Sequence, residues 1–141
     1  CHKNCCQCSL IQYDISKAKQ NAKNNQVDIN FINQDMSTYK EKKYNVIISN
    51  PPYIKTEEIK TLQPEIAFEP FMALNGGDDG LVFYRALSEN WFTYINKGGY
   101  IAMEIGEEQG KDVLSLFVNK ADKARVIKDA SGLDRVVAVK R

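Results

Sequence analysis

The sequence predicts an α/β fold with a mostly parallel sheet and an antiparallel edge at the C-terminal end. Strand-like and helix-like segments alternate along most of the 141 residues, which is typical of a sheet built with crossover helices. The last two predicted strands, 124–129 and 135–139, are joined by the turn at 131–134 with no helix between them. These two strands are therefore expected to pair in antiparallel fashion.

The first predicted elements are a helix and a strand. Residues 15–24 are mostly polar, with a narrow apolar face at Ile15, Ala18 and Ala22, as in a surface helix. Residues 27–31 alternate apolar and polar side chains, which predicts a strand.

A second strand is predicted at 44–49. Val46, Ile47 and Ile48 form a short, continuous, β-branched run. Such a run is typical of a strand buried on both faces of a parallel sheet.

The C-terminal half begins with a long segment, 54–80, that has no sustained periodicity and is predicted to be a loop with one helical turn near 56–62. Loops of this length in compact domains are usually functional. The elements predicted after it are a helix at 81–95 ended by Lys97-Gly98-Gly99, a strand at 100–105, a helix at 107–119, and the two closing strands.

Composition and charge limit the classes of protein to which this chain can belong. The chain is 43% hydrophobic and 26% charged, which is ordinary for one globular domain. A net charge of +1 does not predict a nucleic-acid partner held through phosphates. With no apolar stretch near twenty residues, a cytoplasmic protein without a membrane partner is expected.

Four cysteines and the single histidine, His2, lie within the first eight residues. Cys5 and Cys8 have the spacing of half a zinc site, but no cysteine or histidine follows Cys8 to supply a second pair. No metal is therefore predicted, and disulfides are not expected in a reducing compartment. Residues 1–14 are interpreted as an atypical cysteine-rich lead segment of a chain that looks like a fragment.

The string Asn50-Pro51-Pro52-Tyr53 directly follows the apolar run. The prolines end the strand and stiffen the turn, at the sheet edge where open α/β folds bind ligands. The Asn50 side-chain carbonyl and the Pro51 carbonyl are two acceptors that together can hold the NH₂ group of a planar amide or amino-base. Tyr53 adds a flat surface. The simpler alternative is a strand terminator with no chemical role.

With other motifs, this turn makes residues 15–141 resemble the S-adenosylmethionine-dependent protein-glutamine N5-methyltransferases, specifically those that methylate the Gly-Gly-Gln glutamine of peptide chain release factors. The other motifs are Glu69-Pro70, Ala73-Leu74, Gly76-Gly77, Asp79-Gly80-Leu81, Tyr84-Arg85, Gly98-Gly99, Glu104-Ile105-Gly106 with Gln109, and Gly132 to Val137. Family members begin with a strand and a glycine-rich cofactor loop, whereas the first glycine here is Gly76. The resemblance implies a partial Rossmann-like methyltransferase fold with its first strand missing.

The resemblance also implies roles for individual residues. Asn50 and Pro51 would be catalytic, and with Pro52 and Tyr53 they would bind the substrate glutamine. Asp35 and Met36 would bind the adenine of S-adenosylmethionine, and Asn50 would also face this cofactor. Asp14 is the one candidate for the acidic residue that holds the ribose, unless it belongs to the following helix. Glu69-Pro70 and Gly76 to Gly80 are interpreted as structural.

The implied function is methylation of a release-factor glutamine by a truncated catalytic domain. Two alternatives stay open: a non-catalytic remnant with little cofactor binding, and a DNA or RNA amino-methyltransferase, which the near-neutral charge disfavours. A sheet deprived of a strand exposes unpaired backbone groups, so self-association is a further expectation.

Overall fold

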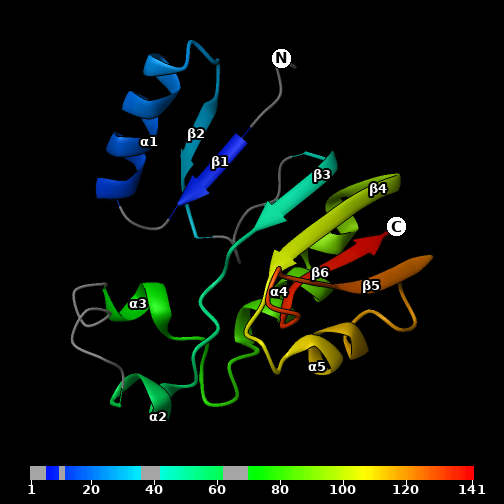
Figure 1. Ribbon diagram of the computed structural model, residues 1–141. Coiled ribbons are helices and arrows are strands. Elements are labelled where there is room, and N and C mark those ends of the chain that lie inside the picture. Colours follow the sequence, from blue (N-terminus) through cyan, green and yellow to red (C-terminus); the bar gives the residue numbers. More distant parts are fainter. Residues whose placement is uncertain (1–5, 10–11, 36–41, 62–69) are drawn as a thin grey trace. The chain divides into compact units, whose positions relative to one another are not determined.

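The computed structural model describes residues 6–9, 12–35, 42–61 and 70–141 (Figure 1). The chain forms two compact units, Cys1–Glu41 and Lys42–Arg141. Cys1, His2 and Cys5 lie outside the described residues. None of the helices in the described ranges is both long and apolar enough to cross a membrane.

The first unit contains two parallel strands and a helix. Strand β1 (Cys6–Ser9) pairs with β2 (Asn30–Asn33), and helix α1 (Gln12–Asn24) connects them. The sequence predicted no strand in the lead segment, because its residues are polar or cysteine rather than β-branched. Helix α1 begins before residue 15 and so crosses the proposed boundary between the lead segment and the catalytic domain; that division stays a prediction.

The second unit is built on a four-stranded mixed sheet with the order β3-β4-β6-β5. Its strands are β3 (Tyr44–Ser49), β4 (Ile95–Glu104), β5 (Lys123–Lys128) and β6 (Asp134–Lys140). Strands β3 and β4 are parallel, whereas β6 is antiparallel to both β4 and β5. The predicted antiparallel pairing of the last two strands is therefore confirmed, and β6 lies inside the sheet, between β4 and the edge strand β5.

Short helices connect these strands. They are α2 (Thr56–Ile59), α3 (Phe71–Leu74), α4 (Val82–Glu89), the 3-10 helix η2 (Trp91–Tyr94) and α5 (Gly110–Ser115). The single helix predicted at 81–95 is divided at Asn90, and the strand predicted at 100–105 begins earlier, at Ile95. The apolar spacing predicts the helix but not its end, because Trp91 and Ile95 continue the same spacing beyond α4.

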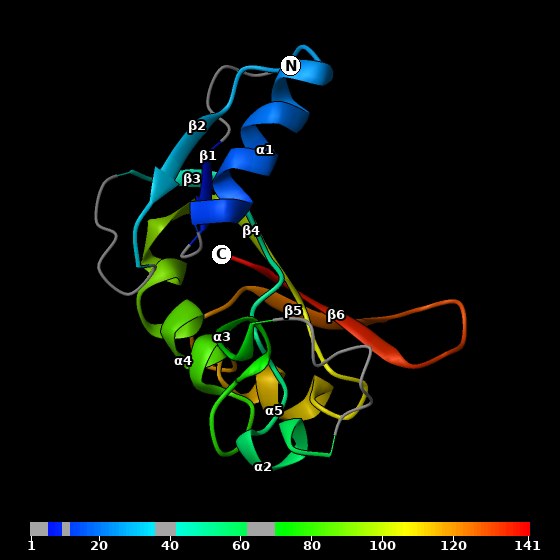
Figure 2. The ribbon, with the colours of Figure 1, turned by 90° about the vertical axis from the view of Figure 1, so that its left-hand side faces the viewer.

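The core lies between one face of the sheet and the layer formed by α4, η2 and α5 (Figure 2). Ile101 and Met103 of β4 and Val137 and Val139 of β6 are fully buried there. The helical layer is held together by the Phe92–Phe117 ring contact at 5.5 Å between centroids. The buried side chains of this layer, together with Phe117 just after α5, are Tyr84, Leu87, Ser88, Trp91, Phe92 and Val113.

The prediction that the strand carrying Val46 to Ile48 is buried on both faces is wrong. Val46 is 56% exposed and Ile48 is 82% exposed. In β3 they alternate with Ile47, so they lie on the opposite sheet face from the helical layer, next to Tyr100 and Ala102 of β4. A continuous apolar run in the sequence does not by itself show that both faces of a strand are covered.

Candidate active site

The turn Asn50 to Tyr53 leaves β3 at the carboxyl end of a parallel pair of strands. Ser49 of β3 is paired with Met103 of β4, so the turn after β3 and the turn after β4 emerge at the same sheet edge. The side chain of Asn50 is exposed, and Pro51 is buried. Within the described part of the chain, no donor bonds to the Asn50 side-chain oxygen or to the Pro51 carbonyl. In these ranges neither acceptor is used by a protein donor.

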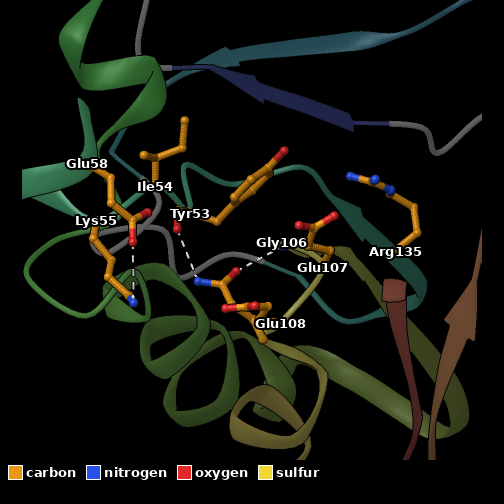
Figure 3. Close-up of a pocket in the computed structure, with 9 residues that line it drawn as sticks. Tyr53, Ile54, Lys55, Glu58, Gly106, Glu107, Glu108 and Arg135 are labelled. Carbon is orange, nitrogen blue, oxygen red and sulfur yellow. Dashed lines mark hydrogen bonds and ion pairs between the residues drawn. The ribbon is translucent and has the colours of Figure 1, made fainter. Parts of the chain in front are cut away.

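A cavity of about 330 Å³ opens beside this turn (Figure 3). Its lining comes from the segment after β3, the segment after β4 and the start of β6. The lining residues are Tyr53, Ile54, Lys55, Glu58, Gly106, Glu107, Glu108, Gln109 and Arg135. Of the residues predicted to bind substrate, Tyr53 is the one that lines the cavity.

Charges of both signs surround the cavity. Arg135 donates from Nη2 to Asp129 at 3.1 Å. The pKa of Asp129 is lowered because its carboxylate accepts from the backbone N–H of Leu133 and from Arg135. On the other side, Lys55 pairs with Glu58 at 3.4 Å. These pairs partly neutralise the basic groups, while Glu107 and Glu108 are exposed.

The segment 74–80 supports the turn from one side. Ile54 donates to the Leu74 carbonyl at 3.1 Å and accepts from Gly76 N–H at 2.8 Å. Gly76 lies so close to the turn that a Cβ there would be 2.8 Å from the Tyr53 Cα. The glycines of this segment therefore have a steric role in the structure.

Asp79 connects the same loop to α4. Its carboxylate accepts from Leu81 N–H at 3.1 Å and forms an ion pair with Arg85. The hydrogen bond from Arg85, followed by the one from Leu81, lowers the pKa of Asp79. The residue before Arg85 in α4, Tyr84, donates to the Glu104 carbonyl at 2.7 Å, and burial raises the pKa of its hydroxyl. The end of the loop is thus attached to α4, and α4 is attached to β4.

The predicted cofactor residues other than Asn50 belong to the first unit. Asp35 is exposed and follows β2, at the carboxyl end of a parallel pair, and it already has an interaction partner. Asp14 lies inside α1, as its alternative interpretation held. Met36 lies outside the described residues. A carboxylate at a strand end suits the amino group of an adenine, whereas Asp14 is not at a strand end.

Gln109 is a site residue whose contacts the sequence did not predict. Its side-chain amide forms hydrogen bonds with Tyr53, Gly80 and Gly106. The spacing Gly106-x-x-Gln109 ahead of a helix was a usable signal, since a Gln can accept a hydrogen bond from the backbone N–H three residues before it, as in a capping box. No local pattern could show its bonds to residues 53 and 80.

Known proteins resemble the chain in sequence and in structure. Residues 8–78 match the family model described as Methyltransferase small domain. The release factor glutamine methyltransferase of Thermodesulfovibrio yellowstonii is 43% identical over 129 residues, covering 89% of this chain and 45% of the relative. That of Agrobacterium fabrum is 36% identical over 149 aligned positions, covering 99% of this chain and 51% of the relative.

Solved structures show the same fold. The release factor-specific protein-(glutamine-N5) methyltransferase of Alicyclobacillus acidocaldarius gives a TM-score of 0.51 at 25% identity, over 82% of this chain and 66% of that one. A Pyrococcus furiosus methyltransferase gives 0.67 at 19% identity, over 95% and 60%. NodS of Bradyrhizobium japonicum, an N-methyltransferase solved with S-adenosyl-L-homocysteine, gives 0.57 at 9% identity, over 95% and 63%.

The similarity has a defined extent. The chain spans about half the length of the curated relatives it matches. The family model nevertheless matches half of the chain, and the sequence relatives align along most of it. The chain belongs to the methyltransferase small domain family, and most of its sequence is similar to release factor glutamine methyltransferases.

Proposed function

We propose that this chain is the catalytic portion of an S-adenosylmethionine-dependent methyltransferase that acts on the Gly-Gly-Gln glutamine of a peptide chain release factor. The observation that carries the proposal is the turn after β3, where Asn50 is exposed and its side-chain oxygen and the Pro51 carbonyl accept no bond from the described residues. The names of the sequence relatives support the choice of substrate. The expected compartment is the cytoplasm.

The turn would act on the nucleophile. An amide nitrogen is a poor nucleophile because its lone pair is delocalised into the carbonyl. The Asn50 side-chain carbonyl and the Pro51 carbonyl would each accept one N–H of the substrate amide, increasing electron density on nitrogen and fixing its direction of attack. Catalysis is then mainly orientation and electrostatic preorganisation, which can contribute several kcal/mol, on the order of measured effective molarities.

No general base has to remove a proton before the methyl group is transferred. The amide nitrogen forms a bond to a methyl carbon as the carbon–sulfur bond breaks, and the sulfur keeps the electron pair. The nitrogen then loses a proton to solvent and becomes the neutral N5-methyl amide. Tyr53, which lines the adjacent cavity, would lie against the planar amide.

S-adenosylmethionine would supply an electrophilic methyl group on a sulfonium. Asp35 would accept from the adenine amino group and Met36 would lie against the ring, with Asn50 facing the reactive end. Asp14 remains the proposed ribose ligand, although its place inside α1 does not favour this. The proposed methyl transfer does not depend on Asp14.

The main rival is a non-catalytic remnant of the fold, and one experiment separates the two. The chain is incubated with a release factor and S-adenosylmethionine carrying a labelled methyl group, and the Gly-Gly-Gln peptide is analysed by mass spectrometry. The proposal expects one methyl group on the glutamine and none on a release factor with Asn in its place. A remnant would transfer no methyl and give no heat on titration with S-adenosylmethionine.

Asn50→Ala tests the amide clamp itself. Losing one preorganised group that holds the reacting centre should lower kcat on the order of 10²–10³-fold. The dissociation constant of S-adenosylmethionine, measured by calorimetry, should change little. Asn119→Ala removes an exposed amide at the end of the α5 region and is the matched control. Unchanged turnover in Asn50→Ala would reject the clamp.

A further inference from the structure

Gln109 connects three segments of the second unit through its side-chain amide. Its Oε1 accepts from Gly106 N–H at 2.9 Å, and its Nε2 donates to the Tyr53 carbonyl at 3.1 Å and to the Gly80 carbonyl at 3.3 Å. The bonds to Tyr53 and Gly106 are dashed in Figure 3. Both N–H groups of the amide are used, one on the turn after β3 and one on the segment 74–80, called here the glycine loop.

The backbone of Gln109 is fixed independently of its side chain. The residue directly precedes α5, its N–H donates to the Gly106 carbonyl at 3.0 Å, and its carbonyl accepts from Val113 N–H at 3.0 Å. With Gly106 N–H bonded to Oε1, residues 106 and 109 form a reciprocal pair like a capping box. The amide is thus held on a rigid helix start and directed at Tyr53.

The fit around the amide is tight. A Cβ at Gly80 would lie 2.5 Å from the Tyr53 carbonyl oxygen and 2.6 Å from Gln109 Nε2. Glycine at this position is what allows the two carbonyls and the amide to meet. The chemistry is also specific, since two carbonyl acceptors require a group that donates twice while its other end accepts from Gly106.

We propose that Gln109 is a positioning residue for the methyl transfer. Between Asn50 and Tyr53 the chain has two prolines with fixed φ, so holding the Tyr53 carbonyl also limits the direction of the Pro51 carbonyl and of the Asn50 amide. The inference rests on the proposed function, but its geometric part concerns the turn alone.

The geometric part is tested by hydrogen exchange on the full chain without substrate. Gln109→Ala removes the acceptor for Gly106 N–H and the donor to Tyr53. Exchange at Gly106 and Ile54 should become about tenfold faster, the effect of losing roughly one hydrogen bond. Amides of β6, such as Val137, should keep their wild-type rates. Unchanged exchange at Ile54 would overturn the inference, whether or not the chain is active.

The catalytic part is tested with Gln109→Glu, which keeps the shape but places a carboxylate oxygen against two carbonyls. A small misplacement of the turn should lower kcat about 10- to 100-fold with little change in cofactor affinity. The carboxyl pKa should lie above its usual value of about 4.3, because the neutral form can donate one bond. Activity of Gln109→Glu should therefore recover partly as the pH falls, unlike that of wild type.

Asn119→Asp makes the same amide-to-carboxylate change at an exposed position and is the control for charge. It should match wild type in kcat, pH profile and exchange. A Gln109→Glu variant with wild-type kcat would contradict the positioning role. A wild-type chain that transfers no methyl, together with faster exchange in Gln109→Ala, would contradict only the proposed function and leave the support of the turn established.

Discussion

At the residue scale, Gly80 lies where the glycine loop meets the turn after β3. Its φ is +74°, and a Cβ would lie 2.5 Å from the Tyr53 carbonyl oxygen. Gly98 has a similar φ of +78°, but nothing lies within 4 Å of its Cβ position. The two residues thus share the same backbone requirement and differ in steric surroundings.

Alanine at these two positions separates strain from steric overlap. Both Gly80→Ala and Gly98→Ala should lose about 1–2 kcal/mol of unfolding free energy, because alanine is disfavoured at positive φ. Gly80→Ala should lose about 1–3 kcal/mol more, since Tyr53 and Gln109 must move. Urea unfolding monitored by circular dichroism measures both. Equal losses would mean that the loop does not support the turn.

The residues of the site differ in how far they could be predicted. The turn after β3 depends on the local order of Asn50, two prolines and Tyr53, and the structure places it at the end of a strand as expected. Gln109 bonds to Tyr53, which is 56 positions away in the sequence, and to Gly80, which is 29 positions away. Such contacts depend on how β4 and the loop pack together, which a local pattern does not contain.

At the scale of elements, the two faces of the four-stranded sheet differ in burial. Ile101 of β4 is 0% exposed, whereas Ile48 of β3 is 82% exposed. Removing buried methylene groups leaves a cavity and typically costs about 2–5 kcal/mol for Ile→Ala. A substitution on an exposed face is usually within about 0.5 kcal/mol.

Ile101→Ala and Ile48→Ala therefore form a matched pair. Urea unfolding should show about 2–5 kcal/mol of destabilisation for the first and roughly 0.5 kcal/mol or less for the second. The buried indole of Trp91, the single tryptophan, offers a fluorescence probe in the helical layer. A large loss in Ile48→Ala would show that this face is covered in solution.

Elements with strong local signals were predicted well. The hairpin β5–β6 follows from two short apolar strands around a glycine-containing turn, in which Asp129 accepts from Ser131 N–H at 2.9 Å and Leu133 N–H at 3.1 Å. Strand β1 was missed because its four residues lack β-branched side chains, and its partner β2 is far along the chain. Parallel pairing of such strands is decided by tertiary contacts.

At the scale of the whole molecule, buried apolar side chains are unevenly distributed. Among residues 15–35 of the first unit, the buried apolar residues are Ile15 and Ala22, whereas the second unit holds the large buried side chains of the sheet and the helical layer. Strand β3 is at one edge of its four-stranded sheet. Self-association through an incomplete sheet stays a prediction, and an edge strand with exposed Val46 and Ile48 favours it.

This distribution predicts that residues 42–141 fold without the first unit. The four-stranded sheet and its helical layer form a core of their own, whereas a unit of about forty residues is too small to bury the apolar area that folding alone usually requires. In urea, a polypeptide of residues 42–141 should unfold in one transition, with coincident midpoints from circular dichroism and Trp91 fluorescence. A polypeptide of residues 1–41 should show no cooperative transition. Separate midpoints for 42–141 would mean that the helical layer needs the first unit to pack on the sheet.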